Sequence, residues 1–330
     1  MSGVIPQVNL NDFTSNESQR QATFVQTIGD ALAEIGFFIL TGHGVDANLV
    51  SRCYDHAAAF FSLPESVKGT YGTYGKQGIN GQHGYTHFGR EHAKDSTWPD
   101  LKEFYQIGRT LTPDYPLYPL FLHNIWPTEI DGFEQDFKNL YLQLERCAFQ
   151  LLGACSLYLD QPMHWLSEMS EDSNTILRVV HYPPLASNQC PDGVRAAAHE
   201  DINLITLLCG STADGLEIMD QNGSWIPVGA NHQYIIVDSG DMMQNLTNGL
   251  FKSAKHRVMN PKDVTSNRFS IPMFVHPRND IDLSPRKEFL GKTGNELWYE
   301  SITAGDYLYR RLVEIGLVNE DDDEQNCAPQ

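Results

Sequence analysis

Five residues in three short segments have the types and spacing of a metal centre beside an anion site. The segments read AAHEDINLITLL, KSAKHRV and NRFSIPMF, and the residues are His199, Asp201, His256, Arg268 and Ser270. Two histidines and one carboxylate can bind one face of an Fe(II) ion and leave the opposite face open. An arginine and a serine beside that metal can hold a carboxylate. The pattern therefore predicts a metal, an anionic co-substrate and room for oxygen.

The metal ligands are expected on neighbouring strands. If HEDINL is extended, side chains two residues apart point to the same face, so His199 and Asp201 face the interior and Glu200 points away. His256 is the best candidate for the third ligand, from a strand distant in the chain. An isolated H-x-D triplet often arises by chance, and a lone buried histidine is usually a hydrogen-bonded core residue. Zinc stays an alternative, because it also accepts two histidines and a carboxylate, although zinc hydrolases usually add a nearby general base.

The anion site is expected on one further strand. Arg268 and Ser270 alternate by two, so both face the same side of that strand. The planar guanidinium matches a carboxylate bidentately, and the hydroxyl can add a third hydrogen bond. A buried arginine needs an anionic partner. The alternative is a structural salt bridge to one of the 42 acidic residues of the chain.

Helices and strands are expected to alternate in the first half of the chain. Residues 4–9 and 37–40 are predicted strands, and residues 15–35 form a predicted helix with apolar residues at helical spacing. A second helix is expected to end near Phe61, and a long amphipathic helix spans residues 128–160. Between these helices, residues 70–98 and the preceding Gly69 hold seven glycines with aromatics and histidines, which indicates a long loop or an irregular hairpin.

Short β segments separated by turn residues begin near residue 174. Eight such segments predict a mainly β fold with flanking helices, whose core is a double-stranded β-helix, or jelly roll, of two packed sheets. They read ILRVVHYP, HEDINLITLL, GLEIMD, SWIPV, QYIIVDSG, MMQNLT, SAKHRVM and RFSIPMFVHP.

The chain is expected to divide into five regions. The third holds the jelly-roll core, and the last is an acidic tail predicted to be disordered. The fourth contains a helix near 304–315. The regions are 1–110 (N-terminal α/β region with a substrate-covering loop), 111–173 (helical segment), 174–280 (core), 281–318 (C-terminal helical region) and 319–330 (tail).

The composition limits the partners and the compartment. The net charge of −19, from 42 acidic and 23 basic residues, predicts that the protein repels nucleic acid and anionic membranes. No secretion signal or membrane-spanning apolar stretch is found, so we expect a soluble cytoplasmic protein. The cysteines form no C-x-x-C pair and are expected to be free thiols. They are Cys53, Cys147, Cys155, Cys190, Cys209 and Cys327.

The chain resembles the plant-type non-haem iron(II), 2-oxoglutarate-dependent dioxygenases, the group that includes isopenicillin N synthase. The resemblance covers roughly residues 4–62 and 174–278. It is carried by IPQVNLNDF with GDALAEIGFFILTGHGV, by RVVHYPP, and by the core segments in the family order. Those core segments are HEDINLITLL, GLEIMDQNGSWIPV, VDSGDMMQNLTNGLFKSAKHRV and NRFSIPMF.

The resemblance implies a role for each of the five residues and adds Tyr182 from HYPP. His199, Asp201 and His256 would bind iron. The far carboxylate of 2-oxoglutarate would be held by the remaining members, Arg268, Ser270 and Tyr182. The implied reaction uses O2, converts 2-oxoglutarate to succinate and CO2, and oxidises a substrate C–H bond, most often by hydroxylation. Ascorbate is an expected aid to the iron.

Two features of the sequence keep open the alternative that the protein is an oxidase of the synthase type, which uses no 2-oxoglutarate. The common Asn-Tyr-Tyr-Pro is Val180-His181-Tyr182-Pro183 here, so one usual polar contact is missing. His181 is not a predicted ligand, because it faces away from Tyr182 on a strand. The HEDINLITLL segment is especially similar to the synthase branch, which uses no 2-oxoglutarate and whose R-x-S motif binds a carboxylate of the peptide substrate.

The substrate is expected to be a small molecule, for example an amino acid or another metabolite, and the acidic composition favours a cationic one such as a basic amino acid. The glycine-rich segment is predicted to cover the mouth of the barrel. Candidate substrate contacts are Tyr85, His87, Glu103 and Arg109, with local salt bridges in a surface loop as the alternative. Three functions remain in competition: a 2-oxoglutarate-dependent oxygenase, a synthase-type iron oxidase, and a non-catalytic jelly-roll binding protein.

Overall fold

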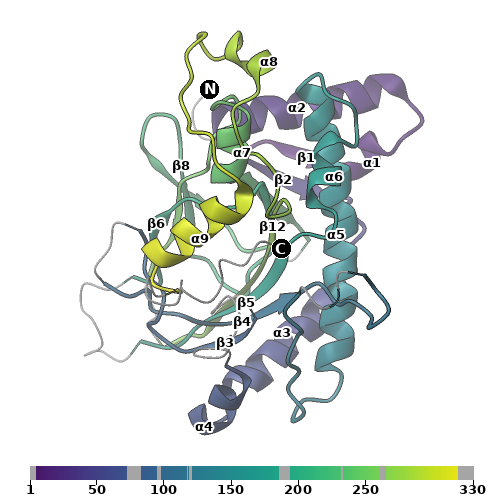
Figure 1. Cartoon of the computed structure of the whole chain (residues 1–330). Helices are drawn as coiled ribbons and strands as arrows, with labels where there is room; N and C mark the ends of the chain where they lie inside the picture. The colour runs from purple at the N-terminus through teal and green to yellow at the C-terminus, as the bar shows by residue number, and fades with distance from the viewer. Residues whose placement is uncertain are drawn as a thin grey trace.

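Two β-sheets form the centre of the fold (Figure 1). The computed structural model describes residues 5–72, 83–94, 98–116, 118, 121–185, 194–231, 233–260 and 265–318. Within these residues the larger sheet has eight strands in the order β1-β2-β10-β7-β12-β5-β4-β3, and the smaller has four in the order β6-β11-β8-β9.

The strands are short, and helices lie between several of them in the chain. Those of the larger sheet are β1 Gln7–Asn9, β2 Phe37–Thr41, β3 Gly84–Thr86, β4 Glu103–Gly108, β5 Ile176–Tyr182, β7 Ile205–Cys209, β10 Ile235–Ser239 and β12 Arg268–Val275. Those of the smaller sheet are β6 Ala196–His199, β8 Leu216–Met219, β9 Trp225–Val228 and β11 His256–Val258.

Side chains from both sheets meet in the interior between them. Phe37 and Ile236 of the larger sheet pack with Leu216, Ile218 and Val228 of the smaller one. Burying these apolar side chains holds the two sheets face to face. The predicted jelly-roll core is therefore confirmed, and strands β1 to β4 extend its larger sheet on both sides.

Helices cover the outer side of the larger sheet (Figure 1). The longest, α5, spans Phe133–Tyr158 and buries one apolar stripe, which confirms the predicted long helix. It contacts α2, α3, β7 and β12. The other helices are α1 Leu10–Phe13, α2 Ser18–Glu34, α3 Ala47–Phe61, α4 Glu65–Lys68, the 3-10 turn Gly69–Tyr71, α6 Trp165–Ser170, α7 Asp241–Leu246, α8 Lys287–Leu290 and α9 Ala304–Glu314.

Two predictions for the core were wrong in detail. The segment MMQNLT is helix α7 rather than a strand, because Gly240 begins a turn of helix and Met242, Met243 and Leu246 bury a helical face. The segment HEDINLITLL is not one strand either. It breaks after β6, and residues 200–204 form the bend that leads into β7.

Several predictions fall partly outside the described residues. Within 70–98, β3 (Gly84–Thr86) forms a hairpin arm that pairs with β4, whereas residues 73–82 and 95–97 are not described. The tail at 319–330 also lies outside the description, as do Cys190 and Cys327. The other four cysteines are buried free thiols. In the described part, no helix is long and apolar enough to cross a membrane. The division into five regions stays a prediction.

Candidate active site

Three predicted metal ligands lie together at one end of the smaller sheet. His199 closes β6 and His256 opens β11, where the two residues are paired in register with ring centroids 4.3 Å apart. Asp201 follows β6 by two residues, and its Oδ1 lies 3.8 Å from the Nε2 atom of each histidine. The ligand atoms all lie within 4.8 Å of one another, which suits one shared metal ion. The expected grouping is present, although the bend after β6 rather than an extended strand positions Asp201.

Backbone carbonyls orient both imidazoles. Nδ1 of His199 lies 2.8 Å from the carbonyl oxygen of Ala197, and Nδ1 of His256 lies 2.9 Å from that of Ala254. A proton on each Nδ1 donates to its carbonyl and leaves the Nε2 lone pair for a metal. Burial lowers the pKa of His199 to about 4, and the neighbouring His256 lowers it as well. His199 is therefore held in the neutral form that binds a metal.

A threonine fixes the carboxylate of the triad. The hydroxyl of Thr206 donates a short hydrogen bond to Oδ2 of Asp201. Nδ2 of Asn203 donates in turn to that hydroxyl at 3.1 Å. These contacts occupy one oxygen of Asp201 and leave Oδ1, the oxygen nearer the two histidines, to face a metal.

Replacing Thr206 with valine should lower the affinity for Fe(II) by about 10–100-fold, the usual cost of losing a partner of a metal ligand. Valine keeps the shape of the side chain but cannot donate to Asp201, so the carboxylate is free to rotate. The Kd is measured by titrating Fe(II) anaerobically into the metal-free protein. Thr70→Val, at an exposed position outside the site, is the control. An unchanged Kd in the Thr206 variant would show that the hydrogen bond does not position Asp201.

The anion-binding residues line a small cavity between the two sheets. The cavity has a volume of about 70 Å³, and its wall includes all three triad residues. Arg268 and Tyr182 are register partners on β12 and β5, with the guanidinium carbon 4.9 Å from the tyrosine ring centroid. Ser270 lies two residues further along β12 and lines the same cavity. The sheet thus brings the predicted anion-binding group to the metal triad.

Arg268 is a buried cation that lacks a carboxylate partner. Its side chain is 1% exposed, and Nε donates to the carbonyl oxygen of Ala213 at 3.1 Å. Its buried Nη1 has no hydrogen-bond partner, and no carboxylate pairs with it, in the part of the chain that the structure describes. Since burying an unpaired charge is costly, this guanidinium requires an anion in the cavity. The structural salt bridge considered above is absent among these residues.

Sequence reasoning missed Asp238, which also lines the small cavity. It lies on β10 opposite Thr206 and is 3% exposed. Burial raises the pKa of this carboxyl well above its usual range, and the charge of Asp201 adds to the effect. Burial therefore favours the neutral form of this carboxyl. The alternation of apolar residues in YIIVDSG placed Asp238 on a strand but gave no signal for a second carboxyl beside the metal.

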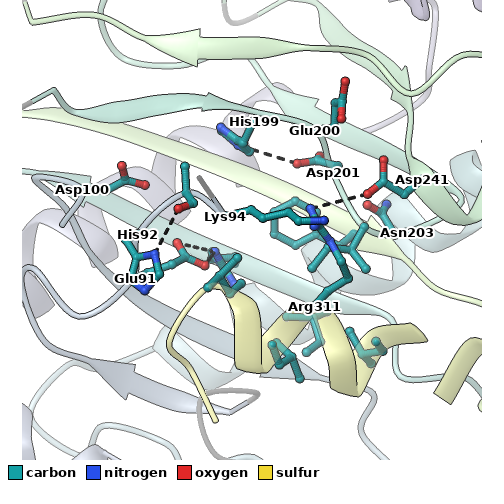
Figure 2. Close-up of a pocket in the computed structure, with 18 of the residues that line it drawn as sticks. Glu91, His92, Lys94, Asp100, His199, Glu200, Asp201, Asn203, Asp241 and Arg311 are labelled. Carbon is teal, nitrogen blue, oxygen red and sulfur yellow. Dashed lines mark hydrogen bonds and ion pairs between the residues drawn. The ribbon is translucent and has the colours of Figure 1, made fainter. Parts of the chain in front are cut away.

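A larger cavity of about 490 Å³ opens on the other side of the triad. Figure 2 shows its acidic and basic residues around His199 and Asp201, with helix α9 closing one side. Tyr307, Leu308, Arg311 and Leu312 of that helix line it. The two cavities share five wall residues, which include His199 and Asp201 of the triad, so molecules bound in the two cavities would meet there. The shared residues are Lys102, Arg178, His199, Asp201 and Phe274.

A buried ion network forms one wall of the larger cavity. Nζ of Lys102 lies 2.6 Å from Glu91 and 2.8 Å from Asp100, and Nη1 of Arg178 lies 3.0 Å from Glu91. Burial alone would raise the pKa of Glu91, but Arg178 and Lys102 outweigh it and lower the pKa to about 2. Sequence reasoning missed this network, because its members come from segments far apart in the chain.

Replacing Glu91 with glutamine should destabilise the protein at pH 7 by about 3 kcal/mol, because it leaves two buried cations without one of their anions. The folded-state pKa of Glu91 lies below its ordinary value of 4.5. Its contribution is therefore complete above pH 4.5 and is lost as the pH falls towards 2. Urea unfolding at pH 7 and at about pH 3.5 should give a smaller difference between variant and wild type at the lower pH. Glu217→Gln, which opens a partly exposed pair with Arg257, should cost about 1 kcal/mol or less. Equal losses for both variants would contradict the prediction.

The four predicted substrate contacts lie elsewhere. Lys102 and Gln106 of the β4 segment line the larger cavity, so Glu103, at the alternate position, faces the opposite side. There Glu103 accepts from Tyr85 at 2.6 Å and lies 2.6 Å from Lys68 Nζ.

Glu103 and Arg109, two of the predicted substrate contacts, also pair with other side chains of the protein. Glu103 also lies 2.7 Å from Nδ1 of His181, which is stacked on Phe269 and is not part of the triad ligand set. Arg109 pairs with Glu145 at 2.6 Å. Neither cavity wall includes Tyr85, His87, Glu103 or Arg109. Their role in substrate binding gains no support from the geometry and stays a prediction.

Comparisons with known proteins agree along most of the chain. Residues 5–129 match the family described as non-haem dioxygenase in morphine synthesis N-terminal, and residues 173–277 match the 2OG-Fe(II) oxygenase superfamily. Proline hydroxylase buaE of Petromyces alliaceus is 30% identical over 94% of this chain and 99% of its own.

Solved structures share the fold. A putative 2OG-Fe(II) oxygenase family protein from Caulobacter crescentus is 34% identical, with a TM-score of 0.81 over 95% of this chain and 99% of its own. A full-length Neurospora crassa protein, solved in complex with alpha-KG, is 27% identical, with a TM-score of 0.81 over 94% of this chain and 97% of its own.

Proposed function

Because the chain belongs to the 2OG-Fe(II) oxygenase superfamily and is an Fe(II)- and 2-oxoglutarate-dependent oxygenase, we propose a division of labour among its site residues. His199, Asp201 and His256 hold Fe(II). The distal carboxylate of 2-oxoglutarate lies against Arg268, with Ser270 and Tyr182 completing the contact. The observation that carries this proposal is the buried guanidinium of Arg268, which lacks a carboxylate partner in the described residues and lies in a cavity that ends at the triad.

When bound, Fe(II) and 2-oxoglutarate together activate O2, convert the keto acid to succinate and CO2, and supply the oxidant for a substrate C–H bond. The protein residues orient and shield this chemistry. The carbonyls of Ala197 and Ala254 hold the two imidazoles with Nε2 free, and Thr206 keeps one oxygen of Asp201 turned away from the metal. The small cavity between the sheets excludes bulk water from the keto acid.

The substrate occupies the larger cavity, and hydroxylation is the expected outcome. The cavity volume of about 490 Å³ falls in the range of small-molecule sites. The relatives support a small molecule, since one is a proline hydroxylase and another was solved with alpha-KG and thymine. We therefore propose a small polar metabolite, with amino acids included, as the substrate class.

Anaerobic addition of Fe(II) and 2-oxoglutarate to the purified protein tests this function. A weak visible metal-to-ligand absorption band should appear, and admitting air with ascorbate present should release succinate. The Asp201→Ala protein is the matched control and should give neither signal. A wild-type protein without the band would exclude 2-oxoglutarate binding at the metal, as expected of a synthase-type oxidase or of a non-catalytic binding protein.

A further inference from the structure

The wall of the larger cavity is balanced in charge, unlike the chain as a whole. Its lining contains five acidic and five basic side chains, whereas the chain has 42 acidic and 23 basic residues. The excess of acidic residues therefore lies outside this cavity. The charge of the cavity wall gives no support to the expectation of a purely cationic substrate. The lining acids are Glu91, Asp100, Glu200, Asp201 and Asp241, and the bases are Lys94, Lys102, Arg178, Lys255 and Arg311.

The charges on one side of the cavity satisfy one another. Lys102 lies within 2.8 Å of both Glu91 and Asp100, and Arg178 adds a second cation to Glu91 at 3.0 Å. Arg178 also donates to Gln106 at 2.8 Å. Asp100 accepts from the amide of Ala197 as well. These short contacts hold the wall rigid. Because its charges are already paired with one another, this wall offers no favourable partner for a charged group of a ligand.

Arg311 and Asp241, on the side closed by α9, form a much looser pair. Nη2 of Arg311 and Oδ2 of Asp241 are 3.5 Å apart, beyond good hydrogen-bond distance. The Nε atom of Arg311 is buried and has no partner among the residues described. Nη1 of Arg311 also contacts Glu314 at 2.7 Å, and the carboxylate of Asp241 accepts from the hydroxyl of Tyr307 at 3.1 Å.

This loose pair lies directly beside the metal triad. The amide of Asp241 donates to the carbonyl oxygen of Asp201 at 2.8 Å. Figure 2 shows Arg311 extending from α9 into the cavity towards Asp241, with His199 and Asp201 on the facing wall. A ligand held between the two charges would be within the same cavity as His199 and Asp201.

We propose, on the basis of the function proposed above, that the larger cavity binds a free amino acid as its zwitterion. The carboxylate accepts hydrogen bonds from Arg311, and the ammonium group donates to Asp241. One long contact between the two protein charges is thereby replaced by two charge-assisted hydrogen bonds. The side chain of the amino acid then extends towards the triad, where its C–H bond is oxidised.

Other ligand charges fit this pair less well. A dicarboxylate or a phosphate ester would place negative charge against Asp241, and a simple cation would place positive charge against Arg311. Like charges brought together in a partly buried site repel each other. A neutral ring would leave both charges without a new partner. A zwitterion satisfies both groups without changing the net charge of the cavity.

The first test uses blocked derivatives of the substrate and the wild-type holoenzyme. Succinate release is measured with each of the twenty standard L-amino acids, and binding is followed by calorimetry under anaerobic conditions. At least one amino acid should bind saturably and stimulate succinate release. Its N-acetyl derivative and its methyl ester should each lose about tenfold or more in kcat/KM, because each removes one charge of the zwitterion.

The second test assigns the two charges to residues. Arg311→Gln should raise KM for the free amino acid and abolish the discrimination against the methyl ester. Asp241→Asn should instead abolish the discrimination against the N-acetyl derivative. Arg310→Gln, on the same helix but in an exposed pair with Glu300, should behave as wild type. Arg311→Lys keeps the charge and should retain discrimination against the ester, which separates charge recognition from a folding defect.

The outcomes separate this inference from the proposed function. If the anaerobic band with 2-oxoglutarate forms but no amino acid binds or stimulates succinate release, the zwitterion is excluded and the function stands. If an amino acid is oxidised but neither variant loses its discrimination, the assignment to Arg311 and Asp241 is overturned. If neither band nor succinate appears, the function and this inference fall together.

Discussion

Asp201→Ala protein should release succinate at less than about one hundredth of the wild-type rate. This loss is greater than the roughly 10–100-fold expected when a metal ligand only loses a hydrogen-bond partner, as in Thr206→Val. Asp201 is the single carboxylate of the triad, and it alone balances part of the charge of a divalent metal there. Alanine leaves two neutral histidines, which bind Fe(II) more weakly and no longer define one closed face. Iron content after anaerobic loading and succinate release in air are measured on the same sample.

His256→Ala and His164→Ala provide a matched comparison for this loss. His256 lies within 3.8 Å of Asp201, whereas His164 is an exposed residue before α6. The first variant should lose iron and activity together, and the second should keep both. If the Asp201 and His256 variants retained stoichiometric iron and wild-type succinate release, the metal centre would have to lie elsewhere.

The sequence predicted the grouping of side chains at the metal end of the site well. His199, Asp201 and His256 are recognisable because each is a strong ligand type, and the R-x-S pair follows at strand spacing. The bend that orients Asp201 could not be predicted, because the apolar pattern of INLITLL fits one continuous strand as well as it fits a bend followed by a strand. Register pairing between β6 and β11, which joins the two histidines, is likewise a tertiary property.

The substrate end of the site was much less predictable. Arg311 lies on a C-terminal helix that is amphipathic in the ordinary way, and nothing in its local pattern distinguishes it from Arg310 beside it. Only the packing of α9 across the cavity buries Arg311 and leaves Arg310 exposed. Glu103 is a second example. Its place in the region expected to cover the barrel mouth predicted a substrate contact. Strand alternation turns it to the far side of the sheet from Lys102 and Gln106, so the geometry gives this prediction no support.

Arg268→Met protein should bind 2-oxoglutarate about 100-fold or more weakly, because removing one partner of a buried charge pair typically costs about 2–5 kcal/mol. The same change should leave the Tm of the ligand-free protein equal to or above that of wild type. Arg268 has a buried Nη1 without a partner among the described residues, so methionine removes an uncompensated charge and fills similar space. Titration of the anaerobic absorption band gives the Kd, and thermal unfolding without 2-oxoglutarate gives the Tm.

Opposite signs for binding and stability distinguish a ligand-binding arginine from a structural one. If Arg268 served the fold, as a salt bridge would, methionine would lower the Tm by leaving its anion unpaired. Arg257→Gln is the matched control, since Arg257 of β11 forms a salt bridge with Glu217 of β8 at 2.7 Å. It should lower the Tm slightly and leave the Kd for 2-oxoglutarate unchanged. Arg268→Lys should recover only part of the affinity, because an ammonium group cannot form the two parallel hydrogen bonds of a guanidinium. A lower Tm with unchanged Kd in Arg268→Met would assign the residue to the fold and leave the co-substrate to be held elsewhere.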